Sequence, residues 1–264
     1  MYRMGTRGAP RRLAQRTRRV VRPISAFENW RDFRHAATVH DDAETILTTR
    51  TGFKIAVRHN KWDAEIVSEQ FFDRSYLRHF QPGVAPVVVD VGGYIGDFGL
   101  LCAHEWPGSR VIIYEPTAEN YEMLAKNLDL NPKLAQRVTL VHKGVSDRPT
   151  VTANVQVEGR EVHVSSRWYA DETSEQREFP CDSLPEIFDV HQLDRIDLLK
   201  VDCEGGEYDI FADVPADVYG RIGQVVMEWH RVPDWEAKLG KLREALSGAD
   251  FHLEKRGQII YAFR

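Results

Sequence analysis

The hydrophobic pattern changes near residue 86, and from there apolar runs alternate with amphipathic stretches. Five mainly apolar runs predict strands, at 87–91, 110–114, 138–141, 196–201 and 224–229. Continuous runs of this kind suit parallel strands that are buried on both faces. Residues 98–104 and 118–130 lie between them with apolar positions at helical spacing, and Trp235 begins a last stretch of this type. The alternation predicts a doubly wound α/β sheet.

Two departures from the alternation predict antiparallel pairs of strands. Within 150–180, apolar and polar residues alternate on both sides of Gly159, and a polar loop is predicted at 170–178. This pattern predicts an inserted β-hairpin. At the end of the chain, residues 251–254 and 258–263 flank a short turn and predict a terminal antiparallel hairpin.

The first 85 residues follow a different pattern. Residues 46–51 and 53–58 predict another hairpin, and residues 63–80 have apolar positions at helical spacing. We therefore expect an N-terminal extension over 28–85, made of a hairpin and a helix, followed by the Rossmann-like domain over 86–264.

Residues 1–27 form an arm with eight arginines and no acidic residue. Removing these eight positive charges from the net charge of −5 leaves −13 on the rest of the chain, which argues against a general nucleic-acid binder. The simplest interpretation is a solvated arm that contacts this acidic body or a partner subunit, as in a homodimer. The alternative is an anchor for nucleic acid or anionic lipid.

Composition narrows the class of protein further. The chain has 264 residues, 42% of them hydrophobic, which is enough to bury a core. No apolar run approaches the roughly 18 residues that span a bilayer, and arginines interrupt the first twenty residues where a signal peptide would be apolar. Cys102, Cys181 and Cys203 lack C-x-x-C spacing, which argues against a disulfide scaffold or a zinc knuckle. We expect a cytoplasmic protein without a membrane span.

A glycine-rich turn follows the first strand of the predicted sheet. The segment reads Asp90-Val-Gly92-Gly93-Tyr-Ile-Gly96, and glycines there allow a sharp turn and a close approach to a ligand. The next strand ends in Glu115, where a carboxylate can take the two hydroxyls of a ribose. The spacing predicts a pocket for an adenosine-type cofactor.

The charges in this pocket favour S-adenosylmethionine over a dinucleotide. Val91 stands where the first glycine of G-x-G-x-x-G would be, and Asp90 would repel a pyrophosphate but attract an ammonium or sulfonium group. Ser146 and Asp147 follow the third strand, where the adenine ring would lie. Their sequence is equally typical of a simple turn.

Acidic residues and a histidine follow the next two strands. Asp202 and Glu204 come after one strand, and Glu228 and His230 after its neighbour, so all four can point into one cleft. Glu207 is interpreted as a stabiliser of a helix N-terminus. Lys200 is expected to pair with a neighbouring carboxylate.

These segments together resemble the FkbM family of S-adenosylmethionine-dependent methyltransferases. The resemblance rests on the glycine-rich segment, on Tyr114-Glu-Pro, on the stretch Lys200-Val-Asp-Cys-Glu-Gly-Gly-Glu and on Glu228-Trp-His, and it runs from about residue 46 to the C-terminus. It implies a class I methyltransferase fold and O-methylation of a hydroxyl on a sugar or natural product. Tyr94 departs from the family, which usually has Asn there.

The predicted chemistry assigns a role to each group in the cleft. His230 is the predicted general base, since its ordinary pKa lies near neutrality. Asp202 would orient the acceptor, act as the base itself, or hold Mg²⁺ together with Glu204 or Glu228. Two other functions stay open at this point: a nicotinamide-dependent oxidoreductase of sugars, and an RNA- or lipid-associated binding protein that uses the arm.

Overall fold

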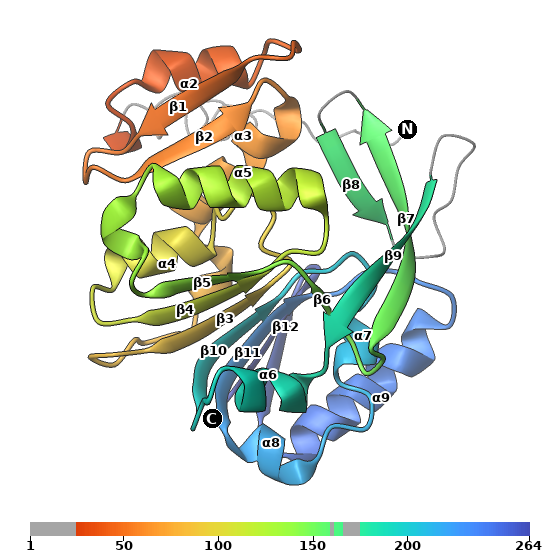
Figure 1. Cartoon of the computed structure of the whole chain (residues 1–264). Coiled ribbons are helices and arrows are strands. Elements are labelled where there is room, and N and C mark those ends of the chain that lie inside the picture. The colour runs from red at the N-terminus through yellow and green to blue at the C-terminus, as the bar shows by residue number, and fades with distance from the viewer. Residues whose placement is uncertain (1–24, 159–160, 166–174) are drawn as a thin grey trace, which may run out of the picture. The chain divides into compact units, whose positions relative to one another are not determined.

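The computed structural model describes residues 25–158, 161–165 and 175–264 (Figure 1). The chain divides into two compact units, a smaller one that ends at Asp73 and a larger one, Arg74–Arg264. Residues 74–85, which the sequence assigned to the extension, thus pack with the larger unit. The arginine-rich arm lies outside the described residues up to residue 24. No helix in the described part of the chain is long and apolar enough to cross a membrane.

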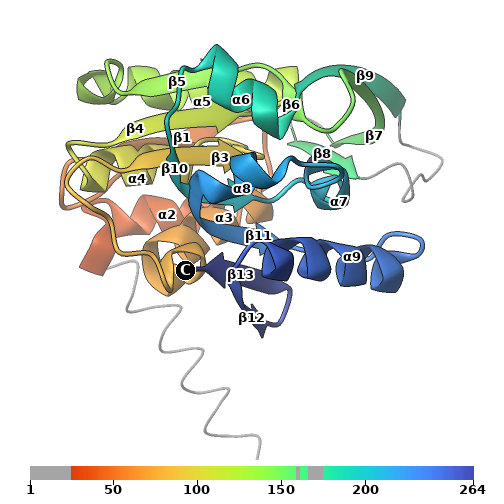
Figure 2. The same cartoon turned by 90° about the horizontal axis from the view of Figure 1, so that it is seen from below.

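A seven-stranded sheet forms the centre of the larger unit. Its strands are β3 (Val87–Val91), β4 (Arg110–Tyr114), β5 (Val138–Val141), β10 (Ile196–Val201), β11 (Ile222–Glu228), β12 (His252–Arg256) and β13 (Ile259–Phe263). Their order is β12-β13-β11-β10-β3-β4-β5. β13 runs antiparallel to both β11 and β12, while the other neighbouring pairs are parallel. The predicted doubly wound sheet and terminal hairpin are confirmed, and Figure 2 shows this hairpin beside β11.

Helices cover both faces of this sheet. α4 (Gly99–Glu105) and α5 (Ala118–Asp129) lie on one face, and α6 (Leu184–Val190), α8 (Ala216–Gly220) and α9 (Trp235–Gly248) lie on the other (Figure 1). Short turns are η2 (Ser75–Leu77), η3 (Pro132–Leu134) and α7 (Glu207–Ile210). The start of α6 shows how sequence fixes a boundary, because Ser183 and Glu186 form a reciprocal capping box there. The mainly apolar central strands are buried between the two helical layers, as their sequences predicted.

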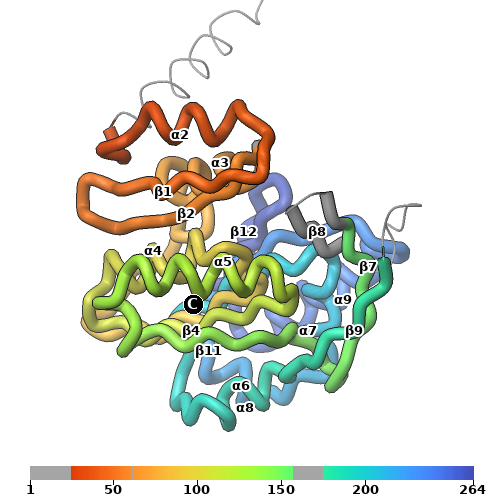
Figure 3. The backbone as a smooth tube through the Cα atoms, turned by 45° about the horizontal axis from the view of Figure 1, so that its top comes forward, coloured from red at the N-terminus to blue at the C-terminus, as the bar shows by residue number. Residues whose placement is uncertain are grey.

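The segment inserted between β5 and α6 forms a separate sheet (Figure 3). Its strands are β6 (Gly144–Val145), β7 (Thr150–Glu158), β8 (Glu161–Ser165) and β9 (Glu175–Asp182), in the order β6-β9-β7-β8. The predicted hairpin is confirmed as β7 and β8. The predicted polar loop over 170–178 is wrong from Glu175 on, because β9 pairs with β7 and buries Phe179 against Val155. The first part of that loop lies outside the described residues.

The smaller unit packs two helical segments against a hairpin. It contains α2 (Trp30–Ala36), β1 (Glu44–Thr48), β2 (Lys54–Arg58), α3 (Lys61–Ser68) and the π-helical turn η1 (Glu69–Asp73). β1 and β2 are antiparallel, which confirms the predicted hairpin. The single helix predicted over 63–80 is wrong, because Arg74 adopts a left-handed conformation with φ of 48° and ends the helical path. A non-glycine residue rarely adopts this conformation, and local hydrophobic spacing does not reveal it.

Candidate functional site

The order of strands reverses between β3 and β10, and the candidate site lies at the carboxyl ends of these strands and their neighbours. β3 is followed in the sheet by β4 on one side, and β10 by β11 on the other. Ligands of open α/β sheets bind at such a switch point. Asp90 lies in β3, Glu115 follows β4, Asp202 follows β10, and Glu228 ends β11. The topology thus gathers the predicted acidic residues along one edge.

The glycine-rich loop after β3 fits closely against the end of β10. Gly92 has a φ of +79°, and a Cβ atom there would lie 1.8 Å from the backbone oxygen of Asp202. Gly96 has a φ of +87°, and a Cβ atom there would contact side chains of Leu100 and Leu124. A side chain at Gly92 is therefore excluded both by the backbone conformation and by space.

Tyr94 occupies the same loop with a φ of 49°. This left-handed region is rare for residues other than glycine, and Asn is the side chain most enriched there. The conformation explains why Asn suits this position in the family. The Tyr94 N–H donates a 2.9 Å hydrogen bond to Oε2 of Glu115.

Glu115 is held by backbone and side-chain donors close to it in space. Oε1 accepts hydrogen bonds from the Thr117 N–H at 2.9 Å and from the Thr117 hydroxyl at 2.6 Å. The side chain is buried, and burial raises its pKa, while these hydrogen bonds act in the opposite direction. A carboxylate has about four acceptor positions. The predicted ribose contact would use the capacity that remains.

Asp90 forms an ion pair with Lys200 rather than standing open to a ligand. The two residues are cross-strand partners in β3 and β10, and Nζ of Lys200 lies 3.0 Å from Oδ1 of Asp90. Nζ also donates to the backbone oxygen of Gly92 at 2.7 Å, so one cation fixes both the strand and the glycine loop. Burial raises the pKa of Asp90, and Lys200 opposes this effect. The pairing predicted for Lys200 is confirmed.

Asp97 belongs to this loop and was missed by the sequence analysis. Its side chain is 5% exposed, and burial raises its pKa to about 8 despite the nearby charge of Lys200. Its position directly after Gly96, the last glycine of the loop, is the sequence signal that could have identified it.

Ser146 and Asp147 follow β6 and form a local turn. The Ser146 hydroxyl donates to Oδ1 of Asp147 at 3.1 Å and accepts from the Arg148 N–H at 3.3 Å. The side chain of Asp147 is 31% exposed. The contacts correspond to the turn interpretation, and the adenine contact of these residues stays a prediction.

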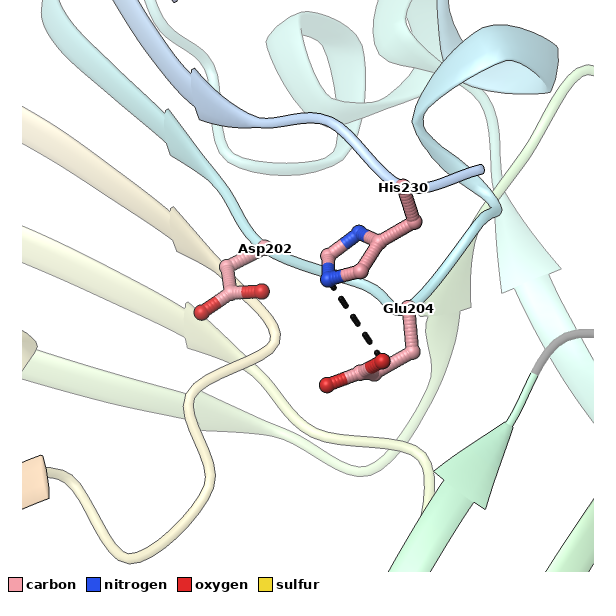
Figure 4. Close-up of side chains that lie close together, drawn as sticks. All are labelled: Asp202, Glu204 and His230. Carbon is pink, nitrogen blue, oxygen red and sulfur yellow. Dashed lines mark ion pairs between the residues drawn. The ribbon is translucent and has the colours of Figure 1, made fainter. Parts of the chain in front are cut away.

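Asp202, Glu204 and His230 lie together beyond the ends of β10 and β11 (Figure 4). One ligand atom from each residue lies within 4.8 Å of the others. Nε2 of His230 is 3.4 Å from Oε2 of Glu204. Glu204 has a φ of 51° and precedes Gly205 with a φ of 106°, so the chain turns sharply and brings Glu204 back toward the histidine. The predicted cluster is therefore present.

Glu207 holds His230 from the opposite side. It is fully buried, and its Oε1 accepts a 2.5 Å hydrogen bond from the His230 N–H and lies 3.4 Å from Nδ1. Oε2 accepts from the Gly205 N–H at 2.8 Å. Glu207 does begin α7, but its carboxylate binds the backbone of the site rather than serving the helix alone. This contact joins residues that are 23 positions apart, so no local sequence pattern predicts it.

The charge state of His230 differs from the simple expectation for a base near neutrality. Burial lowers the pKa of His230, but Glu207, Glu204 and Asp202 together outweigh this and raise it to about 9. The imidazole is thus mainly protonated at neutral pH. Burial and neighbouring carboxylates raise the pKa of Glu204 to about 7, although its side chain is 57% exposed and solvent screens part of this effect.

Tyr76 links two of the acidic residues and was also missed. Its hydroxyl lies 3.0 Å from Oδ2 of Asp202 and 3.0 Å from Oε2 of Glu228. The side chain is 5% exposed and packs edge-on against Phe98. Tyr76 is separated from Asp202 by 126 positions. Nothing in the sequence near Tyr76 indicates this partnership.

Aromatic rings suit sugar acceptors, and the sequence offers four candidates for the wall of an acceptor pocket: Trp168, Tyr169, Trp229 and Trp235. Trp229 is buried, stacks on Trp235 at 5.0 Å, and has Lys255 over its ring. Trp229 is thus part of the core. Trp168 and Tyr169 lie outside the described residues.

Known proteins resemble this chain over most of its length. Methyltransferase sdnD of Sordaria araneosa is 28% identical over 204 residues, covering 64% of this chain and 76% of that protein. The 31-O-demethyl-FK506 methyltransferase FkbM of Streptomyces tacrolimicus is 28% identical over 252 residues, covering 83% and 94%. A solved FkbM methyltransferase of Methylobacillus flagellatus has 16% identity and a TM-score of 0.49, covering 75% of this chain and 48% of that one.

The family assignment follows from residues 90–253. These residues match the model of the methyltransferase FkbM domain, and the match begins at Asp90 and includes both the glycine-rich loop and the acidic cluster. The assignment sets aside the nicotinamide-dependent oxidoreductase. The chain belongs to the FkbM family of methyltransferases.

Proposed function

We propose that this protein transfers the methyl group of S-adenosylmethionine to a hydroxyl group of a sugar or natural-product small molecule. The observation that carries the proposal is the charge along the carboxyl edge of the sheet. The acidic residues there are Asp90, Asp97, Glu115, Asp202, Glu204, Glu207 and Glu228, and Lys200 and His230 are already paired with some of them. Such an edge favours a cationic ligand and disfavours a pyrophosphate.

The cofactor and the acceptor would occupy different halves of this edge. Glu115 would bind the ribose, and the loop from Gly92 to Gly96 would approach the methionine end. The methyl group would then point toward the ends of β10 and β11. Alignment of the methyl group with the acceptor oxygen would supply much of the rate enhancement.

The reaction removes one proton from the acceptor. The bond between the methyl group and sulfur breaks while a bond between the methyl group and oxygen forms, giving an ether and S-adenosylhomocysteine. The hydroxyl proton passes to the cluster of Asp202, Glu204 and His230. Asp202 and Glu204 can accept a hydrogen bond from the hydroxyl and take up its proton, whereas His230, which is protonated at neutral pH, must first lose its own proton.

A methyl-transfer assay tests this proposal. The full chain is incubated with S-adenosylmethionine labelled in its methyl group and with neutral sugars, polyketides and phenols. Matched amines and carboxylic acids that lack the hydroxyl serve as controls. We expect label in an ether of at least one hydroxyl compound. Label that appears only in the amines or carboxylic acids would contradict O-methylation while leaving methyl transfer intact.

A further inference from the structure

We infer that Asp202, Glu204 and His230 form a binding site for one divalent metal ion, with a preference for Mn²⁺, Fe²⁺ or Zn²⁺ over Mg²⁺ and Ca²⁺. Each residue contributes one donor atom, and the three atoms lie within 4.8 Å of one another. Figure 4 shows the carboxylates of Asp202 and Glu204 on the same side as Nε2 of His230. The donor set includes a histidine, whereas the sequence suggested that Asp202 holds Mg²⁺ together with Glu204 or Glu228.

The pairing of β10 and β11 and the turn at Glu204 together bring the three donor side chains close to one another. β10 and β11 are parallel neighbours, with Val201 opposite Met227, so the residues that follow them emerge side by side. The left-handed turn at Glu204 folds its side chain back toward His230. Three donors from the protein leave further coordination positions for water or a substrate oxygen, as catalytic metal sites require.

The contacts behind the donors are those that a metal site needs. A metal-binding histidine usually has a carboxylate or carbonyl group beside its second ring nitrogen, which orients the ring. Here Nδ1 of His230 lies 3.4 Å from Glu207, which is fully buried and fixed by two backbone N–H groups. The hydroxyl of Tyr76 likewise donates to Oδ2 of Asp202. Glu207 and Tyr76 do not belong to the cluster, so their placement is an independent observation.

The identity of the donors determines the preferred ions. Imidazole nitrogen suits Zn²⁺ and Fe²⁺, and carboxylate oxygen suits Mn²⁺, whereas Mg²⁺ and Ca²⁺ favour sites made of oxygen alone. The charge of the cluster supports a cation as well. Carboxylates surround a single imidazole, and Lys200 is paired with Asp90.

The metal site stands independently of the proposed reaction, because an ion can be measured on the protein without cofactor or acceptor. If both proposals hold, the ion would bind the acceptor oxygen next to the methyl group and promote loss of its proton, which would then pass to solvent because Asp202, Glu204 and His230 serve as ligands.

Titration of the full, tag-free chain with MnCl2 after treatment with EDTA tests the site. Loss of the spin-resonance signal of free Mn²⁺ measures binding, and calorimetry with ZnCl2 and MgCl2 compares the ions. We expect one Mn²⁺ per chain and weaker binding of Mg²⁺. Asp202→Asn and His230→Gln should each weaken binding by about 100-fold, and Tyr76→Phe by about 10-fold, the usual effect of a group behind a ligand.

Glu228→Gln is the matched control, because it changes a carboxylate that shares Tyr76 with Asp202 but is not a donor. We expect its Mn²⁺ affinity to stay within about 3-fold of wild type, well below the usual effect of losing a supporting group. Thermal unfolding of each variant without metal checks that the fold is intact. No saturable binding at millimolar Mn²⁺ would overturn the proposal. So would a loss of binding in Glu228→Gln with none in His230→Gln, since the donors would then be carboxylates alone.

Discussion

The two halves of the candidate site are held in place by different kinds of contact. At the ends of β3 and β4, Glu115 is held by the N–H groups of Tyr94 and Thr117, and the loop beside it is shaped by glycines. At the ends of β10 and β11, the hydroxyl of Tyr76, which comes from a distant part of the chain, lies 3.0 Å from both Asp202 and Glu228, while Glu207 accepts from backbone N–H groups. The first half is fixed mainly by contacts local in sequence, and the second by contacts between distant segments.

This difference determines what single substitutions can do. A substitution in the glycine-rich loop at the end of β3 should disturb the fold and the cofactor site together, because the same backbone atoms support both. A change among the side chains of the other half should alter chemistry while the sheet and the cofactor site persist. Each of the following predictions either separates the two halves or shows that they act as one.

The largest effect is expected for Gly92→Ala. The new Cβ atom would overlap the backbone oxygen of Asp202, and the φ of +79° adds strain. We expect a loss of at least about 3 kcal/mol in the free energy of unfolding, comparable with other strained or overpacked sites. Gly240→Ala in α9 is the control, since its Cβ atom would meet nothing within 4 Å. It should stabilise the helix by about 0.5 to 1 kcal/mol. Urea unfolding compares them, and a Gly92→Ala protein as stable as wild type would show that the loop can move.

A large effect on rate alone is expected at the other half. With an acceptor that the wild type methylates, His230→Ala and Asp202→Asn should each lower kcat by about 10² to 10⁴. Cofactor affinity should change by less than about 3-fold, which corresponds to under 1 kcal/mol. The reason is that neither residue contacts the proposed ribose position. Single-turnover rates and calorimetry measure the two quantities. An equal loss of cofactor affinity would mean that the halves are not separable.

A smaller effect is expected for Glu115→Gln. Removal of the charge should weaken S-adenosylhomocysteine binding by about 10- to 100-fold, the range for a hydrogen bond to a charged group. Glu119→Gln, on α5 and paired with Arg177, is the control for a lost surface charge. Calorimetry measures both affinities. If the two variants bind the ligand equally well, Glu115 is not the ribose contact.

An effect of similar size is expected at Asp97, and it depends on pH. Its pKa rises from the usual 3.8 to about 8 in the folded protein, so the protonated form favours folding below pH 4 and this contribution is lost as the pH rises toward 8. Asp97→Asn cannot ionise. Its stability relative to wild type should therefore increase between pH 5 and pH 8, by roughly 1 to 3 kcal/mol given about 1.4 kcal/mol per pKa unit. Urea unfolding at both pH values checks this, and a difference that does not change with pH would contradict the buried, protonated state.

The same contrast explains what the sequence could predict. Apolar runs and glycine spacing are local signals, so they placed β3, the loop from Gly92 to Gly96, and Glu115 correctly. Alternation of strands and helices then placed Asp202 and His230 at the same edge. The contacts of Tyr76 and Glu207 depend on how distant segments pack, and the left-handed Arg74 that precedes Tyr76 has no counterpart in the hydrophobic pattern. The protonation of His230 likewise depends on neighbours that only the fold brings together.

Thermal unfolding of the full chain with different cofactors tests the central claim, that the acidic edge binds S-adenosylmethionine. A ligand present at about 100 times its Kd stabilises the folded state by about 2.7 kcal/mol, which corresponds to a rise in Tm of roughly 5 to 10 °C for a chain of this size. We expect such a rise with S-adenosylmethionine and with S-adenosylhomocysteine, and none with NAD or NADP at the same concentration. An equal rise with NAD, or no rise with either adenosyl compound at millimolar concentration, would contradict the account.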